Sequence, residues 1–161
     1  MNHVLEKDLG AHHHEIFHTY IAIIGCYRYD RNLIAAEEAA ELLIQRSSSS
    51  LQMMKYLPHA LRKSSHVLKD LSRYPEAMGV CHRILDQDPT ILSNEMCIYT
   101  KEDLAELHRI QGNLLMESLY LSQALETSRV FFGKDAAPSL HILDKLELSL
   151  SEQAKLEARY S

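Results

Sequence analysis

A block of eight residue positions recurs three times along the chain and constrains its fold more than any other feature. The first copy is Tyr20, Ile23, Ile24, Tyr27, Leu33, Ala36, Ala40 and Leu43. At the same offsets, the second copy is Leu61, Ser64, Ser65, Leu68, Tyr74, Ala77, Cys81 and Ile84. The third copy is His108, Gln111, Gly112, Leu115, Leu121, Ala124, Ser128 and Phe131. Two amphipathic helices joined by a tight turn produce this spacing, so the pattern predicts an all-α fold of stacked helix pairs.

The composition agrees with one soluble, helical domain. The 161 residues include only 5 Gly and 4 Pro, too few for a turn-rich β fold, and the formal charge of −5 argues against nucleic acid as the partner. No apolar run resembles a signal peptide or a membrane span, so we expect a cytoplasmic protein that binds no membrane. Cys26, Cys81 and Cys97 have no metal-type spacing, and we expect reduced thiols, with Cys26 and Cys81 buried.

The predicted organisation is a short polar lead-in followed by one repeat domain. We expect the lead-in over residues 1–11, helix pairs over about 12–46, 51–89 and 100–132, and a capping helix over 138–158. The boundaries rest on local signals. Asn32 can cap the second helix, Pro58 kinks the third or sits in its first turn, and Thr100 with Asp103 resembles a capping pair that begins the fifth helix. The fifth helix is expected to end near Ser118.

Several local motifs carry a family resemblance. Gly112-Asn113-Leu114-Leu115 followed by Ala124, and Tyr74-Pro75-Glu76-Ala77 ending in Asp88-Pro89, resemble the tetratricopeptide repeat (TPR) over roughly residues 14–145. The alanine spacing of 41 and 47 residues exceeds that repeat's usual period of about 34. This longer period, with the phrase from Phe131 to Pro138, looks like kinesin light chains and the helical C-terminal region of SET-and-MYND methyltransferases. The resemblance implies a right-handed α-solenoid that binds proteins and is not an enzyme.

One motif looks catalytic. His14-Glu15-Ile16-Phe17-His18 spells H-E-x-x-H, which on a helix places two zinc ligands on one face with a glutamate to activate water. Glu37 lies where a third ligand of glutamate-type zinc peptidases would be. We expect no strand before the motif to align a peptide, and Glu37 falls in an ordinary Ala/Glu-rich helix. We therefore predict no metal, cofactor or catalytic residue, and keep a small zinc hydrolase using His14, His18 and Glu37 as the alternative.

A partner is expected on the first helix of each pair, which lines the concave face of such a repeat. The residues there that lie outside the packing register are mainly basic. Those we predict to bind a partner are Arg62, Lys63, His66, Lys69, Arg109 and Asn113. Asn113 also matches the asparagine that holds ligand backbone in the resembled family. We therefore predict a scaffold or adaptor module that binds an acidic protein or peptide. The sequence also leaves open whether the chain is a subunit of a larger complex or a helical accessory region of a larger enzyme.

Overall fold

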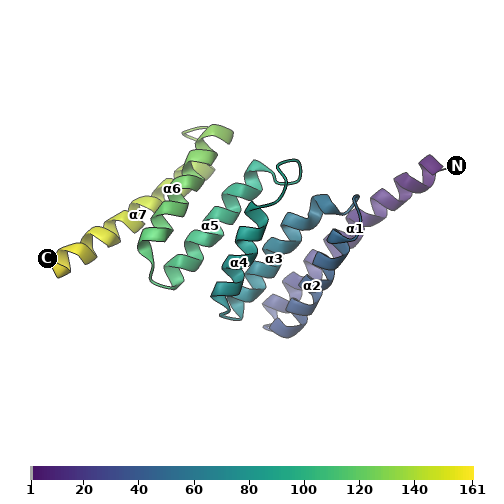
Figure 1. The fold of residues 1–161 in the computed structure, drawn as a ribbon, viewed down its shortest axis with the longest axis horizontal. Helices are drawn as coiled ribbons and strands as arrows, with labels where there is room; N and C mark the ends of the chain where they lie inside the picture. Colours follow the sequence, from purple (N-terminus) through teal and green to yellow (C-terminus); the bar gives the residue numbers. More distant parts are fainter. Residues whose placement is uncertain (1) are drawn as a thin grey trace. The chain divides into compact units, whose positions relative to one another are not determined.

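The structure, a computed structural model, describes the backbone of residues 2–161 and the side chains of residues 13–161. Every regular element in that part of the chain is helical, which confirms the all-α prediction (Figure 1). The helices are α1 Asn2–Tyr29, α2 Leu33–Ser48, the short 3-10 helix η1 Met54–Tyr56, α3 Leu57–Asp70, α4 Tyr74–Leu85, α5 Asn94–Ile110, α6 Leu114–Phe131 and α7 Ala137–Tyr160. They form two compact units, residues 1–91 and 92–161.

Two of the predicted local signals have the expected role. The Oδ1 atom of Asn32 accepts a hydrogen bond from the Ala35 backbone N–H at 3.4 Å and caps α2. Pro58 sits in the first turn of α3, where its missing N–H costs no helical hydrogen bond. At the other end of the chain's first unit, α4 ends at Leu85, a few residues before Pro89.

Two other boundaries differ from the prediction. The backbone of the expected lead-in is part of α1 from Asn2 onward. The fifth helix begins at Asn94, not near Thr100, because the Ser93 hydroxyl accepts a hydrogen bond from the Met96 N–H at 3.1 Å and caps it. The predicted cap formed by Thr100 and Asp103 is therefore wrong, and Thr100 is a fully buried residue inside α5. Met96 and Ile98, which lie between the predicted pairs 51–89 and 100–132, are therefore part of α5, and both are buried.

Three helix-to-helix turns share one backbone hydrogen-bond pattern. Each contains one residue in the left-handed region, Arg31 (φ 60°), Ser72 (φ 61°) or Gly112 (φ 76°). The next residue's N–H donates to a carbonyl five residues back at 2.9 Å: Asn32 to Tyr27, Arg73 to Leu68, and Asn113 to His108. This bond closes the end of one helix while the following residue begins the next. The three turns lie 41 and then 40 residues apart.

The turns overturn the predicted register of the third block. Gln111 and Gly112 lie in the turn after α5, not on a helix face, and the fifth helix ends at Ile110 instead of Ser118. The residue that corresponds to Ala36 and Ala77 is Glu117, because each donates its N–H to the carbonyl of the residue that precedes its helix. Ala124 lies seven residues further along α6. Seven residues are almost two helical turns, so the apolar pattern fits both registers equally well.

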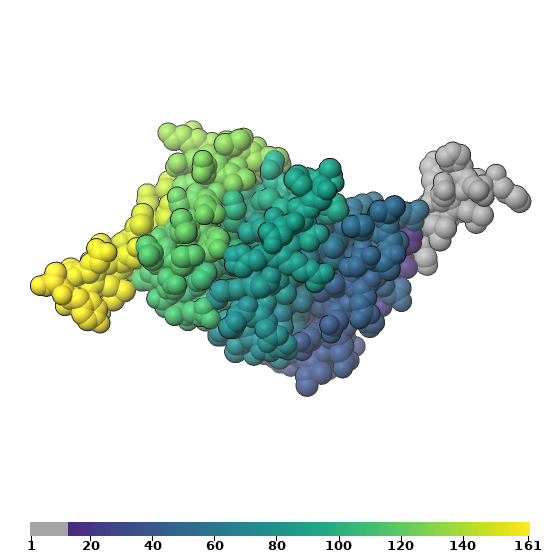
Figure 2. Space-filling view, in the orientation of Figure 1, coloured from purple at the N-terminus to yellow at the C-terminus, as the bar shows by residue number. Residues whose placement is uncertain are grey.

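Each unit has its own core. In the first unit, α2 supplies small residues that let α1 and α3 approach it closely, and the buried cluster contains Phe17, Ile24, Ala36, Ala39, Ala40, Leu43, Met53, Tyr56, Ala60 and Val67. In the second unit, α5, α6 and α7 surround the cluster Ile98, Ala105, Leu121, Ala124, Leu125 and Ile142. Ala77 and Ala124 are both fully buried. The last turns of α7 extend past α6, and residues 154–161 are all exposed (Figure 2).

The turn geometry predicts opposite effects for two glycine substitutions. Gly112→Ala should lower the free energy of unfolding by about 1 kcal/mol, because an L side chain is strained at a positive φ. Gly79→Ala should raise it by about 0.5–1 kcal/mol, because Gly79 lies within α4 and its new Cβ meets open space. Urea denaturation followed by circular dichroism measures both. Equal effects of the two substitutions would contradict the turn assignment.

Candidate partner-binding surface

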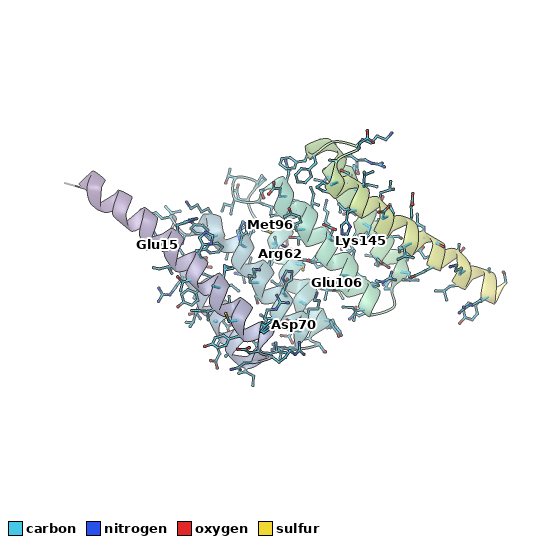
Figure 3. The ribbon with its side chains drawn as sticks, turned by 180° about the vertical axis from the view of Figure 1, so that it is seen from behind. Glu15, Arg62, Asp70, Met96, Glu106 and Lys145 are labelled. Carbon is cyan, nitrogen blue, oxygen red and sulfur yellow. The ribbon has the colours of Figure 1, made fainter. Side chains whose placement is uncertain are left out.

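Helix α3 carries four of the six residues predicted to bind a partner. Arg62, Lys63, His66 and Lys69 are spaced by one, three and three residues, which places them on one side of the helix (Figure 3 labels Arg62). The other side packs Leu61 and Leu68 into the protein. We refer to these four residues as the α3 basic row.

The α3 basic row is less exposed than the sequence suggested. All four side chains are half-buried, and each has an interaction partner within the folded chain. Their place outside the packing register of α3 therefore does not make them fully exposed. Long basic side chains commonly lay their aliphatic stems on neighbouring residues and keep their charged ends accessible. The row is accordingly built into the surface of the first unit.

The only carboxylate on α3 is already neutralised. Asp70, at the last residue of the helix, accepts a hydrogen bond from Arg28 Nε of α1 at 2.6 Å. The two side chains are 18% and 28% exposed, so the pair is partly shielded from water. The carboxylate at the end of the α3 basic row is thus held by an arginine of α1.

The other two predicted residues, Arg109 and Asn113, belong to the second unit and have structural roles there. The Arg109 guanidinium donates to Glu117 and to Glu152, each at 2.9 Å. Hydrogen bonds to Glu152 and Glu117 raise the pKa of Arg109 above its ordinary value. The Asn113 side chain accepts from the Met116 N–H at 3.2 Å and so caps α6.

Glu117 is a buried carboxylate that the sequence prediction missed. It is 4% exposed, and besides Arg109 it accepts a hydrogen bond from the Ser149 hydroxyl of α7 at 3.1 Å. Gln153 of α7 donates to the Leu114 carbonyl at 2.8 Å, one turn before Glu117. A buried carboxylate needs such partners, because its desolvation is costly without them. Aligning the helix turns would have revealed Glu117, since it occupies a site that is alanine in the other two pairs.

The H-E-x-x-H residues pack around an aromatic pair. Phe17 is buried and stacks on Tyr56 with ring centroids 4.4 Å apart, and His14 Nδ1 lies 3.1 Å from the Tyr56 hydroxyl. The His14 and His18 rings are 4.2 Å apart, centre to centre. Glu37 instead accepts a hydrogen bond from Arg73 at 2.5 Å. Among residues 13–161, no three His, Cys, Asp or Glu side chains gather to hold a metal ion.

No disulfide joins the three cysteines, and they differ in exposure. Cys81 is buried, as expected, whereas Cys97 is half-buried and burial raises the pKa of its thiol. Cys26 is exposed, which contradicts the prediction of a buried thiol. It lies on the side of α1 away from the core residue Ile24, because two residues along a helix rotate the side chain by about 200°.

Comparison with known proteins does not extend the sequence resemblance. No protein-family model matches the chain, and no curated protein matches it. Within the described residues, none of the helices combines the length and apolarity needed to cross a membrane.

The Glu117 network predicts a difference between two glutamates of α6. Glu117→Ala should lower the free energy of unfolding by about 1–3 kcal/mol, because Arg109 and Ser149 lose a shared buried acceptor. Glu126→Ala removes an exposed carboxylate of the same helix and should change it by less than about 0.5 kcal/mol. Thermal or urea unfolding measures both values, and a neutral Glu117→Ala would show that the network adds no stability.

Metal removal tests the zinc alternative. We expect dialysis against a strong chelator to leave the helical circular dichroism and the thermal midpoint unchanged, because Glu37 is held by Arg73 and does not join the two histidines. Zinc added back should not change them either. Loss of helical signal on chelation, or a peptidase activity abolished by His14→Ala, would contradict the prediction that no metal is required.

Proposed function

We propose that the chain is a non-enzymatic, TPR-like helical-repeat module that binds an acidic segment of a partner protein through the α3 basic row. The observation that carries this proposal is the recurrence of one turn geometry at nearly constant spacing. Repeats of paired helices stack into right-handed solenoids, and such solenoids act as binding surfaces. In this proposal α7 serves as the capping helix.

The turn spacing supports a repeat more strongly than the alanine spacing did. Measured between turns, the period is 41 and then 40 residues, whereas the alanines suggested 41 and 47. A nearly constant period is what stacked copies of one structural unit require. It remains longer than the usual TPR period of about 34, as the likeness to kinesin light chains implies.

The local charge of α3 supports an acidic ligand. Arg62, Lys63 and Lys69 lie together on α3, and the only acid of that helix is paired with Arg28. The chain as a whole carries a formal charge of −5, so the α3 basic row is a local departure from the average. Such a patch attracts carboxylates and raises the rate and specificity of association. We place the ligand on α3 because three cationic residues lie together there, whereas Arg109 is a single cation that already binds two carboxylates.

The same module suits either of two settings, a subunit of a larger complex or a helical accessory region of a larger enzyme. The zinc hydrolase has less support. Its third ligand, Glu37, forms an ion pair with Arg73, and the aromatic pair Phe17 and Tyr56 accounts for the packing of the helix that carries His14 and His18.

Charge reversal on α3 tests the proposal. Arg62→Glu combined with Lys63→Glu should weaken binding of fluorescent acidic peptides, selected from an acidic peptide array, by about tenfold at low salt. The difference should shrink at physiological salt, where the screening length is about 8 Å. Fluorescence anisotropy measures the affinity, and circular dichroism checks the fold.

A matched control changes the net charge equally elsewhere. Arg83→Glu with Arg129→Glu reverses two exposed arginines of α4 and α6 and should leave peptide affinity nearly unchanged. If both double variants weaken binding equally, only net charge matters. If the α3 variant binds like the unmodified protein at both salt concentrations, the ligand uses another surface.

A further inference from the structure

Helix α1 presents an uncharged stripe on the side away from its core. Thr19, Ala22, Ile23, Cys26 and Tyr27 line a shallow hollow of about 430 Å³. Ile23 is 38% exposed and Tyr27 36% exposed, whereas Ile24 of the same helix is fully buried. We call these five residues the α1 stripe. The function proposed above makes no use of it.

The shape of the hollow fits a side chain from another helix. Its first four lining residues lie at positions i, i+3, i+4 and i+7 of α1. Four residues at this spacing form the hole that receives one side chain, the knob, when two helices pack in a coiled coil. The small side chains of Ala22 and Cys26 give the hole its depth. Ile23, one of these four residues and 38% exposed, has the size and shape of a knob that can enter the same hole on a second helix.

The equivalent face of α3 shows what covers such a stripe within this fold. The shift of 41 residues between the first two turns places Ala60 and Val67 where α1 has Thr19 and Cys26. Ala60 and Val67 are fully buried in the core cluster to which the alanines of α2 contribute. On α3, therefore, this face packs against a helix. In the described part of the chain, the α1 stripe has no such cover.

We propose that a second copy of this chain covers the α1 stripe, with the two α1 helices packed antiparallel about a twofold axis. The stripe contains both a knob and a hole, so it is complementary to itself, as a twofold interface requires. Its five residues carry no charge, although the chain has a net charge of −5, so two copies can meet here without bringing carboxylates together.

The charges beyond the two ends of the stripe fit the antiparallel orientation. Glu15 lies one turn before Thr19 on α1, and Arg31 lies in the turn that follows the helix (Figure 3 labels Glu15). Antiparallel packing brings the N-terminal side of one stripe to the C-terminal side of the other. Glu15 of each copy then lies at the end of the interface where Asp30 and Arg31 of the other lie, whereas parallel packing would bring the two Glu15 carboxylates to the same end.

Sedimentation equilibrium on the whole chain tests the interface. The unmodified protein should show twice the monomer mass of 18.5 kDa at high concentration and dissociate on dilution. Ile23→Glu should weaken the dimer at least tenfold, because it places a charge at the centre of the stripe. Ile34→Glu is the control. Ile34 is a 70% exposed isoleucine of α2 outside the stripe, and its substitution should leave the dimer intact. Circular dichroism should show both variants folded.

The reactivity of Cys26 reports on the face that is used. Cys26 is the exposed cysteine, so its alkylation by N-ethylmaleimide should slow as protein concentration rises and the stripe becomes covered. In Ile23→Glu the rate should not depend on concentration. A protein that stays monomeric at the highest concentration overturns the proposal and leaves the stripe to a helix of another polypeptide. A dimer that survives Ile23→Glu, or one that leaves Cys26 equally reactive, overturns it too, because the copies then meet elsewhere.

Discussion

The left-handed residue between paired helices is the constraint on which the architecture depends. At Arg31, Ser72 and Gly112 the chain leaves one helix with a positive φ, and the next residue closes the helix end through a bond to a carbonyl five residues back. This geometry reverses the chain within a few residues and sets which faces of the two helices meet. Glycine occupies the site only in the third turn, so in the other two the packed helices offset the backbone strain of Arg31 and Ser72.

Much of the fold was predictable from the sequence because its signals are local. Asn32 and Pro58 act within one turn of their own helices, and the apolar spacing identifies helices without reference to distant residues. The predicted register of the third repeat block was wrong for a physical reason. Ala124 and Glu117 lie almost two turns apart on the same side of α6, and a pattern of apolar residues repeats at that interval. Ser93 likewise supplied a cap earlier than Thr100, so α5 took in a segment expected to be a connector.

The candidate site was less predictable, because a charged residue does not reveal its partner in the sequence. Arg109 looked like a binding residue, yet Glu117 and Glu152 engage it, and Glu152 is far away along the chain. Glu37 looked like a metal ligand, yet Arg73 holds it. Asp70, the acid next to the α3 basic row, is paired with Arg28 of α1, which the sequence also did not reveal. Such pairings depend on tertiary contacts that spacing alone does not encode.

The buried glutamate of α6 also restricts the order in which helices can stack. Ala36 and Ala77 are tolerant sites, since any apolar face can lie against an alanine. Glu117 is selective, because its carboxylate must meet both an arginine from the preceding helix and a hydroxyl from the helix that follows. Arg109 and Ser149 provide these groups. If another helix of this chain replaced α7 and had no serine at the position of Ser149, the buried Glu117 carboxylate would lose a hydrogen-bond donor. The Glu117 carboxylate therefore favours the packing of α7 against α6 and disfavours arrangements in which another helix takes the place of α7.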